Sequence, residues 1–336
     1  MRKKMIPAIL ALALLAGCGT PAAPSASSSG DASLPPAGEL EHYLDRTVVV
    51  EEIEIENEAV ALSSSPAAID IKLLPEASGK ATKSGKNAVI DYSNTGDGYV
   101  MVQYTTASDK RLKVQVAGPN TTYTYDLPAQ SWETFPLSDG NGNYKVTALQ
   151  NTEGKKYAVL ASASFSVTLK DEFAPYLRPN QYVDYSDAAN TVAKAAELTS
   201  GVTDPLQKVE KIYDFVVKTL TYDKDKAATV QSGYLPVLDT VLSAKKGICF
   251  DYASLMAGML RAEGVPCKLV VGYAGKAYHA WISVWTESTG WVDGIIYFDG
   301  SAWQRMDPTF ASSSNASEEI MKYIGDGSNY TVKYLY

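Results

Sequence analysis

The hydrophobic period of the chain changes near Asp171, and this change limits the possible folds more than any other feature of the sequence. Before it, short runs rich in Val, Tyr and Thr alternate with turn clusters, the pattern of half-buried strands. The runs cover residues 99–104, 112–116, 123–125, 144–149 and 161–169. After it, apolar residues recur with the spacing of helices. The sequence therefore predicts an α+β chain in which an all-β sandwich precedes a helix-containing domain.

The second region shows helix starts and stops that can be placed on the sequence. Helices are predicted over residues 186–198, from 205 to about 220, over 236–245 and from 249 to 262. Asp204 is a capping residue and Pro205 suits the first helical position. The last helix stops at Gly264, with Pro266 two residues further on, which is a normal helix termination. Strands are predicted over 268–273, over 278–285 and around Trp303.

The N-terminus has the pattern of a secretion signal. Residues 1–17 combine a basic start with an apolar run that is too short to remain as a membrane-spanning helix. The run ends in Leu-Ala-Gly-Cys, which resembles the bacterial lipobox, in which the cysteine is acylated. Cys18 is therefore expected to carry lipid and to hold the chain on the outer face of the cell membrane. The alternative is an ordinary signal peptide with a stray cysteine.

Residues 18–45 are rich in Ala, Ser, Pro and Gly, and we expect a flexible tether there. His42, at its end, has no second metal ligand nearby and is interpreted as a solvated bystander. Residues 46–170 follow as the β-rich sandwich domain, beginning with an alternating apolar and acidic run over 46–57. Residues 171–336 form the last predicted domain.

Three cysteines, two histidines and a net charge of −8 exclude several kinds of protein. Structural zinc sites need four gathered Cys or His ligands, and disulfide scaffolds need many paired cysteines. The excess of acidic residues argues against a nucleic-acid partner, because phosphate contacts require basic residues. We expect no metal and no cofactor.

One thiol, one imidazole and one carboxylate stand in an order that suits covalent catalysis. Cys249 begins a helix, where unpaired N–H groups and the helix dipole stabilise a thiolate. His279 lies on one predicted strand, and Asp307 ends another. Such a set provides a nucleophile, a base and a group that orients the base. Each also has a plain alternative: a buried cysteine, a structural histidine and a turn aspartate.

The sequence motifs around these three residues resemble those of a known family. They are Cys249 with Asp251-Tyr252-Ala253, Arg261-Ala262-Glu263-Gly264-Val265-Pro266, Gly272-Tyr273, His279-Ala280-Trp281, Trp303 and Asp307-Pro308-Thr309. In this order they closely resemble the transglutaminase-like superfamily over residues 204–310. The resemblance implies a papain-like core of helices packed on an antiparallel sheet. It also implies that Cys249 is the nucleophile, His279 the general base and then acid, and Asp307 the residue that orients the imidazole.

The resemblance further implies an oxyanion donor upstream of the nucleophile, and Tyr222 is the candidate. Trp281, Trp303 and Tyr278 are candidates for lining the substrate site, and each could equally fill the core. Cys267 is interpreted as core packing, with a blocking disulfide to Cys249 as the alternative. The segment between Trp285 and Trp303 is longer than a minimal hairpin and could form a flap.

The expected function is acyl transfer or hydrolysis at a glutamine carboxamide or peptide bond, through a thioester on Cys249. The expected partners are a protein or peptide substrate at the cell surface or cell wall, and the membrane through the N-terminal lipid. Two alternatives stay open. One is a cysteine peptidase or amidase acting on cell-wall or surface peptides. The other is a surface binding protein without catalysis.

Overall fold

The computed structural model describes residues 73–293, 296–298, 303–305 and 330–336. The expectations for the signal peptide, Cys18, the tether with His42, the run over 46–57 and Asp307 fall outside these residues. In the described part of the chain, no helix combines the length and the hydrophobicity that crossing a membrane requires.

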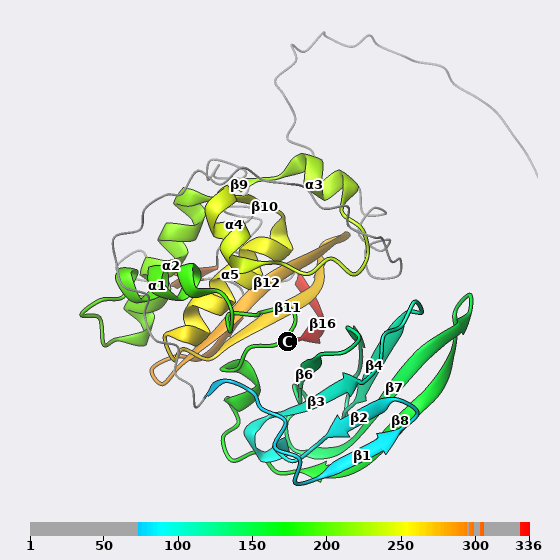
Figure 1. Cartoon of the computed structure of the whole chain (residues 1–336). Helices are drawn as coiled ribbons and strands as arrows, with labels where there is room; N and C mark the ends of the chain where they lie inside the picture. The colour runs from blue at the N-terminus through cyan, green and yellow to red at the C-terminus, as the bar shows by residue number, and fades with distance from the viewer. Residues whose placement is uncertain (1–72, 294–295, 299–302, 306–329) are drawn as a thin grey trace, which may run out of the picture. The chain divides into compact units, whose positions relative to one another are not determined.

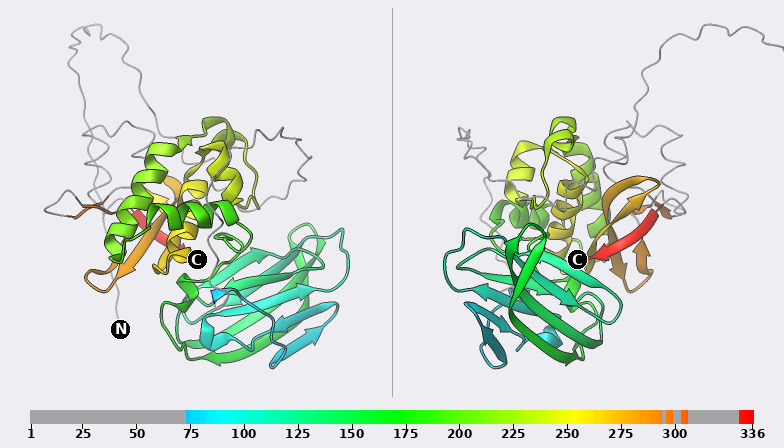
Figure 2. Two further views of the ribbon diagram at one scale, coloured as in Figure 1. Left: turned by 60° about the vertical axis from the view of Figure 1, so that its left-hand side comes forward. Right: turned by 90° about the vertical axis from the view of Figure 1, so that its right-hand side faces the viewer.

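Two four-stranded antiparallel sheets form the first part of the described chain (Figures 1 and 2). One has the order β1 (Thr82–Gly85), β2 (Ala88–Asp91), β3 (Tyr99–Tyr104), β6 (Trp132–Pro136). The other has the order β5 (Thr122–Asp126), β4 (Leu112–Ala117), β7 (Gly142–Glu153), β8 (Lys156–Val167). The expected sheet-rich N-terminal region is present. A short 3-10 helix, η3 (Thr95–Asp97), precedes β3, and another, η4 (Ala174–Tyr176), follows the sandwich.

The alternation of side chains explains how the two sheets pack. In β4, Leu112, Val114 and Val116 are buried, whereas the residues between them are half-buried or exposed. Because successive strand side chains point to opposite faces, one face of this sheet joins the sandwich core and the other faces outward. Lys113 and Gln115 on the outward face also line the cavity described below.

Helices and a second antiparallel sheet make up the rest of the fold. The helices are α1 (Ala189–Leu198), α2 (Pro205–Thr219), α3 (Lys224–Thr229), α4 (Leu238–Ala244) and α5 (Cys249–Ala262). The sheet has the order β13 (Gly290–Asp293), β12 (Ala277–Thr286), β11 (Cys267–Ala274), β16 (Tyr330–Leu335). Two small sheets pair β9 (Thr221–Tyr222) with β10 (Lys246–Gly247), and β14 (Ile296–Phe298) with β15 (Trp303–Arg305). The mixed α+β architecture is confirmed.

Helix α5 occupies the centre of this second part. Nearly every residue from Cys249 to Arg261 is buried, as expected for a helix that is apolar all round. α1, α2 and α4 pack against it, and so do β11 and β12 (Figure 1). Gly264 ends α5 with a φ of +75°, the left-handed conformation that glycine adopts without strain.

Buried Arg261 fixes the end of α5 to its surroundings. Its guanidinium donates hydrogen bonds to the carbonyl oxygens of Cys267 in β11, Arg178 and Tyr336, at 2.9, 2.7 and 2.6 Å. The last contact holds the chain just after β16 against α5. Because buried charged groups must be hydrogen-bonded, this set of acceptors accounts for the arginine in the motif.

The structure differs from the sequence expectations in several places. The first helix begins at Ala189 instead of at residue 186, and α3 was not expected at all. Part of the segment between Trp285 and Trp303 is β13, an edge strand of the central sheet that pairs Trp291 with Trp285; whether the segment acts as a flap stays a hypothesis.

Candidate active site

Cys249 is the first residue of α5, and two features of its loop hold it there. Asp251 turns back toward the helix start, and its Oδ2 accepts a hydrogen bond from the Ile248 N–H at 2.8 Å. Gly247 leaves room for this contact, since a Cβ at that position would lie 2.6 Å from the Cβ of Asp251. The thiol therefore belongs to a helix end whose first N–H groups have no partner within the helix.

A buried ionic cluster surrounds Asp251, whose side chain is 0% exposed. Lys226 of α3 places its Nζ 2.8 Å from Oδ2, and the Tyr234 hydroxyl donates to Oδ1. Burial, together with the nearby Asp251 carboxylate, raises the pKa of Tyr234 well above its usual range. The Lys226 charge also lies 4.1 Å from the centre of the Tyr234 ring. These contacts tie α3 and the loop after it to the start of α5.

Tyr222 lies beside the loop that carries the nucleophile. Strands β9 and β10 are parallel and place Tyr222 opposite Gly247, two residues before Cys249. Two backbone hydrogen bonds of 2.9 Å, from Thr221 N to Lys245 O and from Asp223 N to Gly247 O, fix this pairing. The oxyanion candidate and the candidate nucleophile, 27 positions apart in sequence, are thereby held as neighbours.

Strand β12 carries Tyr278, His279 and Trp281. The imidazole of His279 is buried and stacks on the Trp281 indole, with ring centroids 6.2 Å apart. His279 pairs with Gly272 of β11, where a Cβ would lie 2.0 Å from the carbonyl oxygen of Thr331 in β16. The glycine of the Gly-Tyr motif therefore permits close pairing of β16 next to the histidine.

The structure describes the side-chain packing of Trp281, whereas for Trp303 it describes the backbone. Trp281 is buried and packs edge-on against Tyr330, with centroids 5.1 Å apart, an arrangement typical of core aromatic residues. The backbone of Trp303 begins β15.

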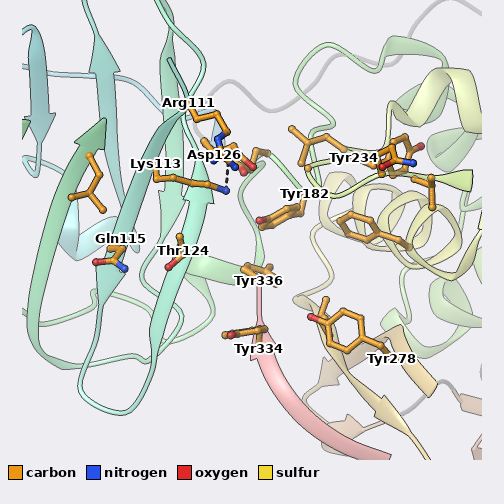
Figure 3. A pocket seen from close by; sticks show the side chains of 18 of the residues that line it. Arg111, Lys113, Gln115, Thr124, Asp126, Tyr182, Tyr234, Tyr278, Tyr334 and Tyr336 are labelled. Atoms are coloured by element: carbon orange, nitrogen blue, oxygen red, sulfur yellow. Dashed lines mark hydrogen bonds and ion pairs between the residues drawn. The ribbon is translucent and has the colours of Figure 1, made fainter. Parts of the chain in front are cut away.

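A cavity of about 910 Å³ adjoins Cys249 (Figure 3). On one side it is lined by Cys249, Tyr278 and tyrosines of the helical part, and on the other by residues of β4 and β5. His279 and Trp281 are not among the described residues that line it. The tyrosines labelled in Figure 3 are Tyr182, Tyr234, Tyr278, Tyr334 and Tyr336.

Sequence reasoning found Cys249 and Tyr278 but missed the other residues of this cavity. The alternating tyrosines near the end of the chain, Tyr334 in β16 and Tyr336 just after it, were a signal that could have revealed this strand. The sandwich wall had no comparable signal, because its polar residues are ordinary outward positions of a half-buried sheet.

Cys267 lies apart from this chemistry. It is fully buried at the start of β11, and burial raises the pKa of its thiol to about 12. Cys249 and Cys267 are both free thiols, so the disulfide considered from the sequence is not formed in this structure. Among the residues described here, no group of three or more His, Cys, Asp or Glu side chains is arranged to hold a metal ion.

Comparison with known proteins shows what the second part of the chain is similar to. Residues 192–308 match the family model of the transglutaminase-like superfamily. A protein-glutamine gamma-glutamyltransferase of Pseudomonas aeruginosa is 32% identical over 68 residues, covering 16% of this chain and 10% of that protein. The uncharacterized protein YebA of Bacillus subtilis is 23% identical over 201 residues, covering 52% of this chain and 26% of that protein.

This chain thus spans about a tenth and about a quarter of the lengths of these two curated relatives. Among solved structures, the periplasmic domain of TgpA from Pseudomonas aeruginosa, bound to ethylmercury, is 17% identical with a TM-score of 0.33. That alignment covers 74% of this chain and 80% of the other. The family resemblance seen in the sequence is confirmed by the match over residues 192–308.

Proposed function

Because residues 192–308 form a transglutaminase-like core, we propose that this protein is a thiol acyltransferase that forms a thioester between Cys249 and the acyl group of a glutamine or peptide substrate. The observation that carries the proposal is the placement of Cys249 at the start of α5, in the wall of a cavity and next to the strand pair that holds Tyr222. A cysteine that served only to fill the core would not need this position.

In the first step, the Cys249 thiolate attacks the acyl carbon and forms a C–S bond, while the carbonyl electrons move to oxygen. The resulting oxyanion needs hydrogen-bond donors. Unpaired N–H groups at the start of α5 and the Tyr222 hydroxyl are the donors we propose. Their support is that β9 and β10 hold Tyr222 opposite Gly247.

In the second step, the tetrahedral intermediate collapses and the C–N bond breaks. We assign His279 as the acid that protonates the leaving ammonia or amine, and Asp307 as the residue that orients the imidazole. The thioester then reacts with an amine, which gives crosslinking, or with water, which gives deamidation or proteolysis. The acceptor loses its proton to His279, and the Cys249 thiolate is regenerated.

We also propose that the enzyme acts outside the cytoplasm, held by lipid on Cys18. The support is the sequence of the first 18 residues, a basic start and an apolar run that ends in Leu-Ala-Gly-Cys. The substrate is then a protein or peptide at the cell surface or in the cell wall.

One experiment separates the possible reactions. The purified full-length chain, in detergent, is incubated with a glutamine-containing protein and a fluorescent primary amine, while peptide cleavage is followed in parallel. Incorporation of the amine that is absent in the Cys249→Ser variant supports the transferase. Cleavage or ammonia release without incorporation replaces it with a hydrolase. If none of these occurs, the thiol-enzyme proposal fails and a binding protein is favoured.

A further inference from the structure

The β-sandwich provides one wall of the Cys249 cavity, although it lies outside the matched core. Lys113 and Gln115 of β4, and Thr124 and Asp126 of β5, line this wall (Figure 3). They occupy the outward positions of strands whose other positions are buried in the sandwich core. The wall is therefore built from side chains that the sandwich does not need for its own packing.

The wall is positively charged in a protein that is acidic overall. Arg111, Lys113 and Lys155 line the cavity together with one carboxylate, that of Asp126, so the charged lining residues sum to +2. The whole chain carries −8. Lys113 and Asp126 form an ion pair of 2.8 Å. A cleft whose lining carries a net charge concentrates ligands of the opposite sign.

Two residues that line this cavity each carry a buried polar atom that lacks a hydrogen-bond partner among the described residues. The two atoms are the hydroxyl of Tyr278 and Oε1 of Gln181, and both side chains are 6% exposed. The amide nitrogen of Gln181 is used, since Nε2 donates to the Asp126 carbonyl at 3.0 Å. An unsatisfied buried polar atom costs about 1–3 kcal/mol, which a ligand can recover by pairing with it.

The two atoms are chemically complementary to a peptide group. Tyr278 can donate to a carbonyl oxygen, and Gln181 Oε1 can accept from an N–H. The cavity, at about 910 Å³, lies at the upper end of the roughly 300–1,000 Å³ of small-molecule sites, which is more than a single primary amine needs.

We propose that this cavity binds an acidic peptide segment adjacent to the reacting residue of the substrate. A main-chain amide of the segment pairs with Tyr278 and Gln181, and its carboxylates face Arg111 and Lys113 on the sandwich wall. The proposal rests on the proposed function for the identity of the reacting residue, but binding itself requires no chemistry. The sandwich is thereby assigned a role in selecting the substrate.

The test measures binding with chemistry switched off. Two fluorescein-labelled peptides of equal length carry a central Gln flanked by Glu residues or by Lys residues, and fluorescence anisotropy follows their binding to full-length Cys249→Ser protein. The Glu peptide is expected to bind roughly fivefold or more tightly, as several rim charges act together. This advantage should shrink when NaCl is raised from about 20 mM to about 300 mM.

Matched variants locate the effect. Arg111→Gln with Lys113→Gln should abolish the preference for the Glu peptide. The control, Lys110→Gln with Lys145→Gln, removes two exposed lysines of the sandwich that do not line the cavity and should preserve it. Gln181→Leu should weaken both peptides equally, since it removes a main-chain contact.

The outcomes keep the two proposals apart. Equal binding of the two peptides, or equal effects of the cavity and control variants, would overturn the acidic-peptide site. If wild-type protein turns over neither peptide while the charge preference persists, the binding site stands and the proposed catalysis fails. If turnover occurs without the preference, the catalysis stands and the binding site fails.

Discussion

At the scale of single residues, the two cysteines of the described core show how position decides reactivity. Cys249 lines a cavity at a helix start, whereas Cys267 is fully buried. With a pKa raised to about 12 by burial, the Cys267 thiol is ionised in roughly one part in 100,000 at pH 7. Since the thiolate is the nucleophile, Cys267 is protected from reaction both by its burial and by the small fraction of its thiol that is ionised.

We therefore predict that iodoacetamide at neutral pH and low concentration modifies Cys249 and leaves Cys267 intact. Mass spectrometry of the proteolytic peptides measures each site separately, so Cys18 does not interfere. The Cys249→Ala protein should keep its melting temperature and show no rapid modification in the core. Equal labelling of both cysteines in the folded wild-type protein would contradict an activated thiol.

Glu133 gives a second residue-scale prediction. Desolvation raises the pKa of this half-buried carboxyl to about 7, although the Thr134 N–H donates to it. The folded state thus holds the proton more tightly than the unfolded chain. The resulting stabilisation is present below about pH 4.5 and is lost as the pH rises through about 7, a change on the order of 3 kcal/mol.

Urea denaturation at several pH values checks this. The wild-type protein should lose stability between about pH 5 and about pH 8 relative to Glu133→Gln, which cannot ionise. Parallel pH profiles for the two proteins would show that Glu133 is not the group responsible.

At the scale of elements, the start of α5 depends on a charge from α3. The Lys226 side chain is 27% exposed and pairs with the fully buried Asp251 carboxylate, two residues from Cys249. Without this cation, an uncompensated negative charge would lie close to the candidate thiolate. Lys226 therefore serves both the packing of α3 and the electrostatics of the helix start.

We predict that Lys226→Met lowers the free energy of unfolding by about 1–2 kcal/mol and slows alkylation of Cys249 at neutral pH. Adding Asp251→Asn removes the uncompensated charge and should restore part of the alkylation rate. The control is Lys218→Met, which removes an exposed partner of Asp214 on α2 and should change neither quantity appreciably. Unchanged alkylation of Lys226→Met would contradict the electrostatic role.

The same elements show which parts of the fold could be predicted. Strand β3 was placed at its observed bounds because alternation is a local pattern. Strand β16 was missed, because its partner β11 lies more than 50 positions earlier and local pattern does not reveal pairing. Tyr222 was proposed only through family resemblance. The two-residue strands that hold it beside Gly247 are too short to produce a period.

At the scale of the whole molecule, tyrosines link the sandwich to the helical part. Tyr336 packs edge-on against Tyr123 and Tyr125 of β5, with centroids 5.7 Å apart in both pairs, and against Tyr182 at 4.4 Å. The Tyr176 hydroxyl donates to the Ser138 carbonyl at 2.7 Å, and Arg178 Nε to the Asp97 carbonyl at 2.8 Å. A substrate site built from both parts requires that they keep their relative position, and these contacts provide for it.

Because of these contacts, the sandwich and the helical part should unfold together. Because buried aromatic contacts join the two cores, we predict a single calorimetric transition for the wild-type protein. Tyr336→Ala removes contacts to both sides and should split the transition into two, one for the sandwich and one for the helical part.

Phe165→Ala is the control, since the Phe165 ring stacks on Tyr92 and Tyr144 within the sandwich. It should lower the single transition without splitting it, because the link between the parts stays intact. Two transitions in the wild type, or a split in both variants, would mean that the parts unfold independently and that the sandwich wall is not held rigidly against Cys249.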